Sequence, residues 1–157
     1  GGGGGGVLAI MSGPEPARTE FESLIRPQLK DCGMPYVLVR GLPGNEESPG
    51  PNELNYADAD TLGKLMAEAR VVICRSGYSS VMDLVMLRKK AVFVPTPGQT
   101  EQEYLAAHLQ EKRLFPYLDQ GQFDLKNAVS MANSFDYHFP DMDFGAYQKT
   151  LERFINK

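Results

Sequence analysis

A loop with the residue types of an anion-binding site follows an apolar run in the middle of the sequence. The run Val71–Cys74 is typical of a buried strand, and residues 75–80 read Arg-Ser-Gly-Tyr-Ser-Ser before a helical pattern begins. Gly77 lets the main chain turn, and the free N–H groups and hydroxyls at a helix start can hold a phosphate or diphosphate. The alternative is that Ser79 or Ser80 simply caps the helix. Neither a P-loop lysine nor a G-x-G-x-x-G pattern is present.

Two charged residues flank this loop, and each has two interpretations. Asp83 lies in the first two turns of the predicted helix, where it can accept hydrogen bonds from a ribose diol or be an ordinary solvated acid. Arg75 can neutralise a phosphate or serve as a structural ion-pair partner.

A second polar segment comes after another apolar run. Residues 96–100 form a loop, and Gln102 and Glu103 stand in the first turn of the next predicted helix. Such amides and carboxylates can bind sugar hydroxyls through paired hydrogen bonds, although a polar first turn is also common in any helix. His108 falls on the apolar side of that helix and His138 in an aromatic stretch, so both are predicted to pack. No triad and no metal-ligand spacing is found, which predicts a site without metal.

The elements that position these loops follow from hydrophobic periodicity. Apolar runs predict strands at 7–11, 36–39, 54–56, 71–74, 91–94 and 114–117. Helical spacing predicts six helices. The first follows a capping box of Ser12 and Glu15, and Pro27 should kink or shorten it. The others are expected at 61–69 behind Asp58 or Asp60, directly after the loop 75–80, at 100–112, at 124–133 behind Asp124, and at 144–155. Alternating strands and helices predict an α/β, Rossmann-like, mostly parallel sheet with helices on both faces. In such sheets ligands bind beyond the carboxyl ends of the strands, so the loops at 12–14, 75–80 and 96–100 are expected to form the site.

Composition limits the possible functions. The 157 residues carry a net charge of −4, which disfavours binding to nucleic acid through bulk charge, and no apolar run is long enough to cross a membrane. Cys32 and Cys74 suggest neither a disulfide framework nor a metal site, so a cytoplasmic compartment is expected. Residues 1–6 are all glycine and are interpreted as a linker or placeholder, and residues 7–157 as one domain.

Three stretches, residues 69–84, 91–95 and 101–104, resemble the C-terminal donor domain of the GT-B glycosyltransferases. The resemblance is to the MurG-like group, which transfers N-acetylglucosamine from its UDP carrier to a lipid-linked acceptor. It implies that the diphosphate lies at Ser12, Gly13, Arg75, Ser76, Gly77, Ser79 and Ser80. Asp83 stands where the family has a glutamate that holds the ribose, and Gln102 and Glu103 stand where it has two glutamines that read the sugar. The main chain near Ala59 is the implied contact for uracil.

The resemblance also implies how such a domain works. A UDP-sugar is its substrate, no cofactor is needed, and the reaction inverts the anomeric centre. The family's acceptor site and catalytic base belong to an N-terminal domain, so that domain or a partner subunit is expected to supply them. The acceptor would be a lipid-linked or other glycan, and the complete enzyme would be peripheral to the membrane. Two alternatives stay open: an epimerase or hydrolase of the same architecture, and a non-catalytic interaction module.

Overall fold

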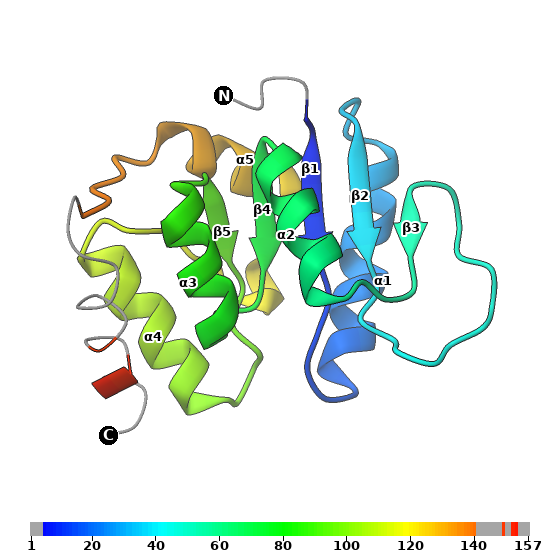
Figure 1. Cartoon of the computed structure of the whole chain (residues 1–157), viewed down its shortest axis with the longest axis horizontal. Coiled ribbons are helices and arrows are strands. Elements are labelled where there is room, and N and C mark those ends of the chain that lie inside the picture. Colours follow the sequence, from blue (N-terminus) through cyan, green and yellow to red (C-terminus); the bar gives the residue numbers. More distant parts are fainter. Residues whose placement is uncertain (1–4, 141–148, 150–151, 154–157) are drawn as a thin grey trace.

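The computed structural model describes residues 5–140, 149 and 152–153, and a parallel sheet forms its centre (Figure 1). Within these residues the sheet has five strands in the order β3-β2-β1-β4-β5, and all neighbours pair in parallel. The strands are β1 (Val7–Ile10), β2 (Tyr36–Val39), β3 (Glu53–Leu54), β4 (Val71–Cys74) and β5 (Ala91–Phe93). The predicted α/β class is confirmed.

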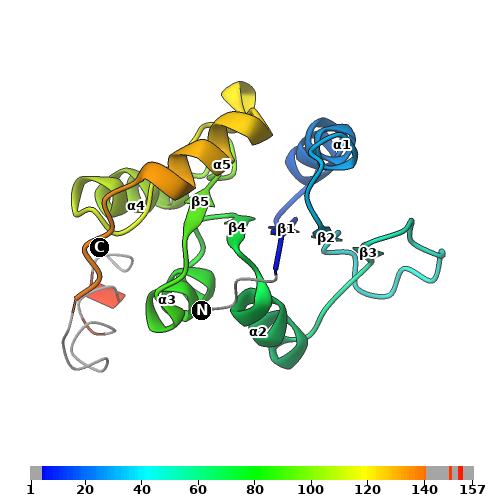
Figure 2. The same ribbon diagram turned by 90° about the horizontal axis from the view of Figure 1, so that it is seen from above.

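The helices lie on both faces of this sheet, as predicted. They are α1 (Ala17–Lys30), α2 (Ala59–Glu68), α3 (Tyr78–Leu87), α4 (Thr100–Glu111) and α5 (Leu125–Ser134), with a 3-10 helix at Gln120–Gln122. Figure 2 shows α1 and α5 on one face and α2 and α3 on the other. None of the helices in the described part of the chain is long and apolar enough to span a bilayer.

Each central strand supplies side chains to two separate cores. In β1, Leu8 and Ile10 pack with α2, α3 and α4, whereas Val7 and Ala9 pack with α1 and α5. The second core also holds Phe21 and Phe123, whose rings meet edge to face with centroids 5.2 Å apart. Burial on both faces explains why the strands appear in the sequence as continuous apolar runs rather than alternating ones.

The start of α1 differs from its prediction. The helix begins at Ala17, so Ser12 does not cap it and the predicted capping box is wrong. The Glu15 carboxylate instead accepts hydrogen bonds from the Thr19 N–H at 2.9 Å and from Arg18 Nε at 2.9 Å. Residues 11–16 therefore form a loop after β1 instead of a helical turn, which leaves this loop at the carboxyl edge of the sheet.

Other predicted boundaries are confirmed or corrected in the same way. Asp58 and Asp124 cap α2 and α5 through their side chains. The strand predicted at 114–117 is only a single parallel bridge between Phe93 and Tyr117. The helix predicted at 144–155 depends on Phe144, Tyr147, Leu151, Phe154 and Ile155, which lie outside the described residues.

Candidate donor site at the carboxyl edge

The strand order creates a crevice between β1 and β4. These neighbours pair side by side, but the chain leaves β1 toward β2 and leaves β4 toward β5 on the other side. Their following helices, α1 and α3, lie on opposite faces of the sheet. The two loops therefore diverge, which is the switch point where parallel sheets bind ligands. The loop after β5 borders the same edge.

The N-terminus of α3 is open toward this edge. Gly77 is its N-cap residue in an extended conformation, and no side chain caps the helix. The alternative that Ser79 or Ser80 caps α3 is therefore wrong. No described residue accepts a hydrogen bond from the main-chain N–H groups of Ser79 and Ser80. Unpaired N–H groups at the positive end of a helix dipole form an anion-binding arrangement.

Arg75 connects its own loop, which follows β4, to the loops that follow β1 and β5. Its guanidinium donates to the carbonyls of Val94 at 3.1 Å, Pro95 at 3.4 Å, Ala17 at 3.4 Å and Ser12 at 3.5 Å. It also lies 4.9 Å from the centroid of the Phe21 ring. Burial lowers the pKa of Arg75 to about 10, which leaves it a cation at neutral pH. The structural interpretation is favoured, but with carbonyls as partners rather than the expected carboxylate.

Two further predicted residues also use their side chains to join loops. The Ser76 hydroxyl is buried and donates to the Gln102 carbonyl at 2.8 Å. Gln102 Oε1 accepts the Thr96 N–H at 2.8 Å, and Gln102 Nε2 donates to Gln99 Oε1 at 2.9 Å. These bonds bring the β4–α3 loop and the first turn of α4 together. A direct contact of either side chain with a ligand remains a prediction.

The other predicted residues are exposed around the same edge. Ser12 and Gly13 lie in the loop after β1, and Gly13 has a φ of +95°, a conformation that favours glycine. Glu103 is exposed in the first turn of α4, and Ala59 is the exposed first residue of α2. No hydrogen bond joins Ala59 to the loops around Arg75.

Asp83 lies one helical turn beyond the open end of α3. It is three and four residues from Ser80 and Ser79, so the three side chains share one side of the helix. Partial burial raises the pKa of Asp83 above its usual value of 3.8, and no cation among the described residues opposes the shift. An unpaired carboxylate at this place is suited to accept hydrogen bonds from a ligand.

Thr96 begins the predicted loop 96–100, but no role was predicted for the residue itself. It is buried directly after β5, and its main-chain N–H is the group that Gln102 binds. It follows Pro95 at the end of an apolar run, and this position in the sequence predicts that it lies at the carboxyl edge of the sheet. Its burial depends on the loop after β1 and could not be inferred locally.

The cysteines and histidines do not contribute reactive groups to this edge. Burial raises the pKa of the Cys74 thiol to about 12, so the thiol stays protonated. His108 is half-buried in the last turn of α4, where burial lowers its pKa. His138 is exposed beside Asp136 at 3.0 Å. Among the described residues no cluster of His, Cys, Asp and Glu could hold a metal ion.

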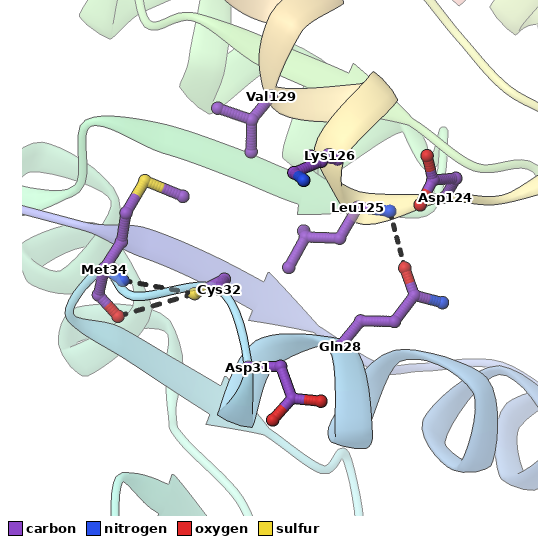
Figure 3. A pocket seen from close by; sticks show the side chains of 8 residues that line it. All are labelled: Gln28, Asp31, Cys32, Met34, Asp124, Leu125, Lys126 and Val129. Carbon is purple, nitrogen blue, oxygen red and sulfur yellow. Dashed lines mark hydrogen bonds between the residues drawn. The ribbon is translucent and has the colours of Figure 1, made fainter.

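A cavity of about 340 Å³ lies elsewhere, between the end of α1 and the start of α5 (Figure 3). In it the Leu125 N–H donates to Gln28 Oε1 at 2.6 Å, and the Cys32 thiol pairs with the main chain of Met34. None of the predicted donor-site residues lines this cavity.

Comparison with known proteins identifies the family. Residues 47–137 match the model of the glycosyltransferase family 28 C-terminal domain, which is more than half of the chain. The chain therefore belongs to glycosyltransferase family 28, and the resemblance noted in the sequence is confirmed.

Two curated relatives are both named UDP-N-acetylglucosamine–N-acetylmuramyl-(pentapeptide) pyrophosphoryl-undecaprenol N-acetylglucosamine transferase. The protein from Sulfurihydrogenibium sp. is 33% identical over 91 residues, which is 58% of this chain and 26% of the relative. The protein from Chlorobium luteolum is 44% identical over 55 residues, 35% of this chain and 15% of the relative. The match thus spans about a quarter or less of each relative's length.

Solved structures share the fold at low sequence identity. ALG13 superposes with a TM-score of 0.63 at 9% identity, over 98% of both chains. MurG from Acinetobacter baumannii gives 0.57 at 16% identity, over 95% of this chain and 52% of that one. SnogD from Streptomyces nogalater gives 0.61 at 10% identity, over 99% of this chain and 39% of that one.

Proposed function

We propose that this chain binds a UDP-sugar at the carboxyl edge between β1 and β4 and acts as the donor half of an inverting glycosyltransferase. The observation that carries the proposal is the uncapped N-terminus of α3 at the switch point, inside the segment that matches the family 28 domain. The names of the relatives make UDP-N-acetylglucosamine the first donor to test.

The donor's diphosphate would lie at the N–H groups of Ser79 and Ser80, with the Ser12–Gly13 loop opposite. The buried charge of Arg75 would act on it through a short distance in a poorly solvated region. Asp83 would hold the ribose, and Glu103 and the free amide N–H of Gln102 would bind the sugar. The main chain at Ala59 would contact the base.

The chemistry assigned to this half is support of the leaving group. In the transfer, the acceptor hydroxyl attacks the anomeric carbon, the bond from that carbon to the phosphate oxygen breaks, and UDP leaves with the electron pair. Fixed N–H donors and the dipole of α3 stabilise the charge that develops on the diphosphate. The proton of the acceptor hydroxyl goes to a base from an N-terminal domain or partner subunit, which would also bind a lipid-linked or other glycan acceptor.

Binding is tested by calorimetry or saturation-transfer NMR with UDP and UDP-N-acetylglucosamine, with ADP as the competing nucleotide. Weak binding of the uridine nucleotides is expected, because half of the cleft wall belongs to the other domain. If folded protein binds no uridine nucleotide at millimolar concentration, the proposal is wrong. Turnover of the UDP-sugar by the chain alone would favour a hydrolase or epimerase.

A substitution pair at Ser79 tests the place of the diphosphate. Ser79→Asp puts a carboxylate in the first turn of α3, which complements the helix dipole but repels a phosphate. The expected result is an unchanged or higher melting temperature together with at least tenfold weaker binding of UDP. Ser79→Asn has nearly the same size without the charge and should bind UDP within a few-fold of the wild type. Equal binding by both variants would place the diphosphate elsewhere.

A further inference from the structure

The hydroxyl of Thr96 is a buried polar group without a partner. The residue is 1% exposed, and no described atom accepts or donates a hydrogen bond at its Oγ1. Its main chain is fully bonded, since the N–H is held by Gln102 and the carbonyl accepts the Gln99 N–H at 3.0 Å. Burying an unpaired hydroxyl costs stability, so a hydroxyl in this place calls for a partner beyond the residues that the structure describes.

The hydroxyl faces the loop after β1. A Cβ atom placed on Gly13 would lie 3.3 Å from Thr96 Oγ1, which is closer than most real contacts of this kind. Because Gly13 has no side chain, the β1–α1 loop can lie close to the hydroxyl. For the same reason, no side chain has to be displaced when this loop shifts.

A second buried polar atom without a partner, Gln120 Oε1, belongs to a residue that contacts the start of α1. Gln120 is 7% exposed, and its Oε1 has no partner, while its Nε2 donates to the Ala17 carbonyl at 3.3 Å. Arg75 donates to that same carbonyl and to the carbonyl of Pro95, next to Thr96. The β1–α1 loop and the first residue of α1 thus lie beside two residues with unpaired polar atoms, Thr96 and Gln120. They also contact a buried cation that pairs with no carboxylate among the described residues.

We infer that the Thr96 hydroxyl donates a hydrogen bond to a phosphate oxygen of the nucleotide-sugar once the Ser12–Gly13–Pro14 loop moves off it. This inference rests on the proposed function and adds a binding residue to it. A phosphate oxygen is the favoured partner because it is an acceptor with a negative charge, and the neighbouring Arg75 and open α3 terminus both favour negative charge. The loop is exposed and its glycine adopts a conformation free of side-chain restraint, which suits such a shift.

Thr96→Val and Thr96→Ser separate this role from a structural one. Valine keeps the shape of threonine without the hydroxyl, and serine keeps the hydroxyl without the methyl group. For Thr96→Val we expect about tenfold weaker binding of UDP, as for a lost hydrogen bond to a charged group. Binding of uridine, which has no phosphate, should stay unchanged, and the melting temperature of the free chain should stay the same or rise. Thr96→Ser should bind UDP like the wild type.

Each outcome decides the inference. If Thr96→Val binds UDP as well as the wild type does, the hydroxyl has no role in binding and the inference is wrong, while the proposed function stands. If UDP and uridine weaken equally, or if Thr96→Val melts at a lower temperature and binds normally, the hydroxyl serves the fold. If the wild type binds no uridine nucleotide, the inference fails together with the proposed function.

Discussion

Buried arginines occur in two regions of this molecule, and they are paired in different ways. At the side of the sheet, three arginines pair with three glutamates in an ion cluster that joins α1 to β2 and β3; its members are Arg18, Arg26, Arg40, Glu15, Glu22 and Glu53. At the switch point, every hydrogen bond that Arg75 makes with the described residues goes to a carbonyl. In the first region, positive and negative side chains balance. The second region, called the open region below, keeps the positive charge of Arg75 beside the uncapped N-terminus of α3.

In the ion cluster, the buried carboxylates are fully paired with arginines. Glu22 accepts hydrogen bonds from Arg18 at 3.0 Å and from Arg40 at 2.9 and 3.2 Å. Glu53 accepts two from Arg26 at 2.9 and 3.0 Å. Every carboxylate oxygen of Glu22 and Glu53 accepts from an arginine, and Glu15 pairs with Arg18 as the third glutamate. The region therefore holds α1 against the sheet edge and has no unbalanced charge to offer a ligand. The difference teaches that a buried charge by itself is no reason to propose a binding site, whereas a buried charge without a counter-charge is such a reason.

The largest expected effect on the free energy of unfolding comes from removing a buried carboxylate of the ion cluster. Glu22→Gln leaves the buried Arg18 without its buried carboxylate, and losses from one-sided removal of a buried pair are about 3–5 kcal/mol. Because Arg26 and Arg40 are partly exposed, we expect about 3 kcal/mol, measured by urea unfolding. Affinity for UDP should not change. Glu15→Gln is the matched control, since its carboxylate is solvated and its loss should cost little.

The same cluster predicts an acid limit to stability. Burial alone would raise the pKa of Glu22, but hydrogen bonds from Arg40 and Arg18 outweigh it and hold the pKa below the usual 4.5. A lowered pKa in the folded state stabilises the fold above the unfolded-state pKa, and this contribution is lost as the pH falls through the folded-state value. The unfolding free energy should therefore fall below about pH 4.5 in the wild type and less steeply in Glu22→Gln. Parallel pH curves for the two proteins would contradict this account.

A smaller effect on the free energy of unfolding is expected from replacing Arg75, the buried cation of the open region. Arg75→Lys keeps the charge but cannot span four carbonyls, so it should cost about 1–3 kcal/mol of unfolding free energy. Arg75→Gln removes the charge as well. If the charge attracts the diphosphate, Arg75→Gln should bind UDP more weakly than Arg75→Lys at low salt, and the gap should narrow as salt is added. Equal affinities at every salt concentration would show that Arg75 serves the fold alone.

Asp83 should change binding without changing stability. If its carboxylate holds the ribose, Asp83→Ala should lose about 1–3 kcal/mol of nucleotide affinity, because hydrogen bonds to a charged group are lost. The unfolding free energy should stay nearly constant, because the residue is exposed and no cation in the described part of the chain pairs with it. Asp83→Asn keeps the shape and tests the charge. Equal affinity of the wild type for UDP and for its dideoxyribose analogue would remove this role from Asp83.

The fold was predictable because its strands are buried on both faces. Continuous apolar runs such as Val71–Cys74 occur where helices cover both sides of a sheet, so they identify position and class together. The prediction of a strand at 114–117 was wrong, because an apolar run of four residues does not tell whether a neighbouring strand is long enough to pair with it. β5 ends at Phe93, and only one bridge forms.

The place where the polar loops meet was predictable, and the contacts that their side chains make were less so. Topology alone puts the ends of β1, β4 and β5 at one edge, and that is where the polar loops meet. Which way a polar side chain turns depends on partners far away in the sequence. Ser76 donates to Gln102, and Arg75 reaches Ser12, so residues with the right types for a phosphate instead bind the main chain.

The smallest effect is expected at His108, which the open region does not need. The ring is half-buried in the last turn of α4, whereas Gln102 and Glu103 lie in the first turn of that helix, where it meets the other loops. Burial lowers the pKa of His108, so the ring is neutral at pH 7 and adds no charge to the open region. A base must come within hydrogen-bond reach of the acceptor hydroxyl, and a group two turns away along α4 does not meet that condition. We therefore expect His108→Ala to bind UDP like the wild type and expect neither protein to turn over UDP-N-acetylglucosamine without an N-terminal domain or partner subunit. Sugar release by the purified chain, measured by chromatography and abolished in His108→Ala, would move the catalytic base into this half and overturn the division of labour.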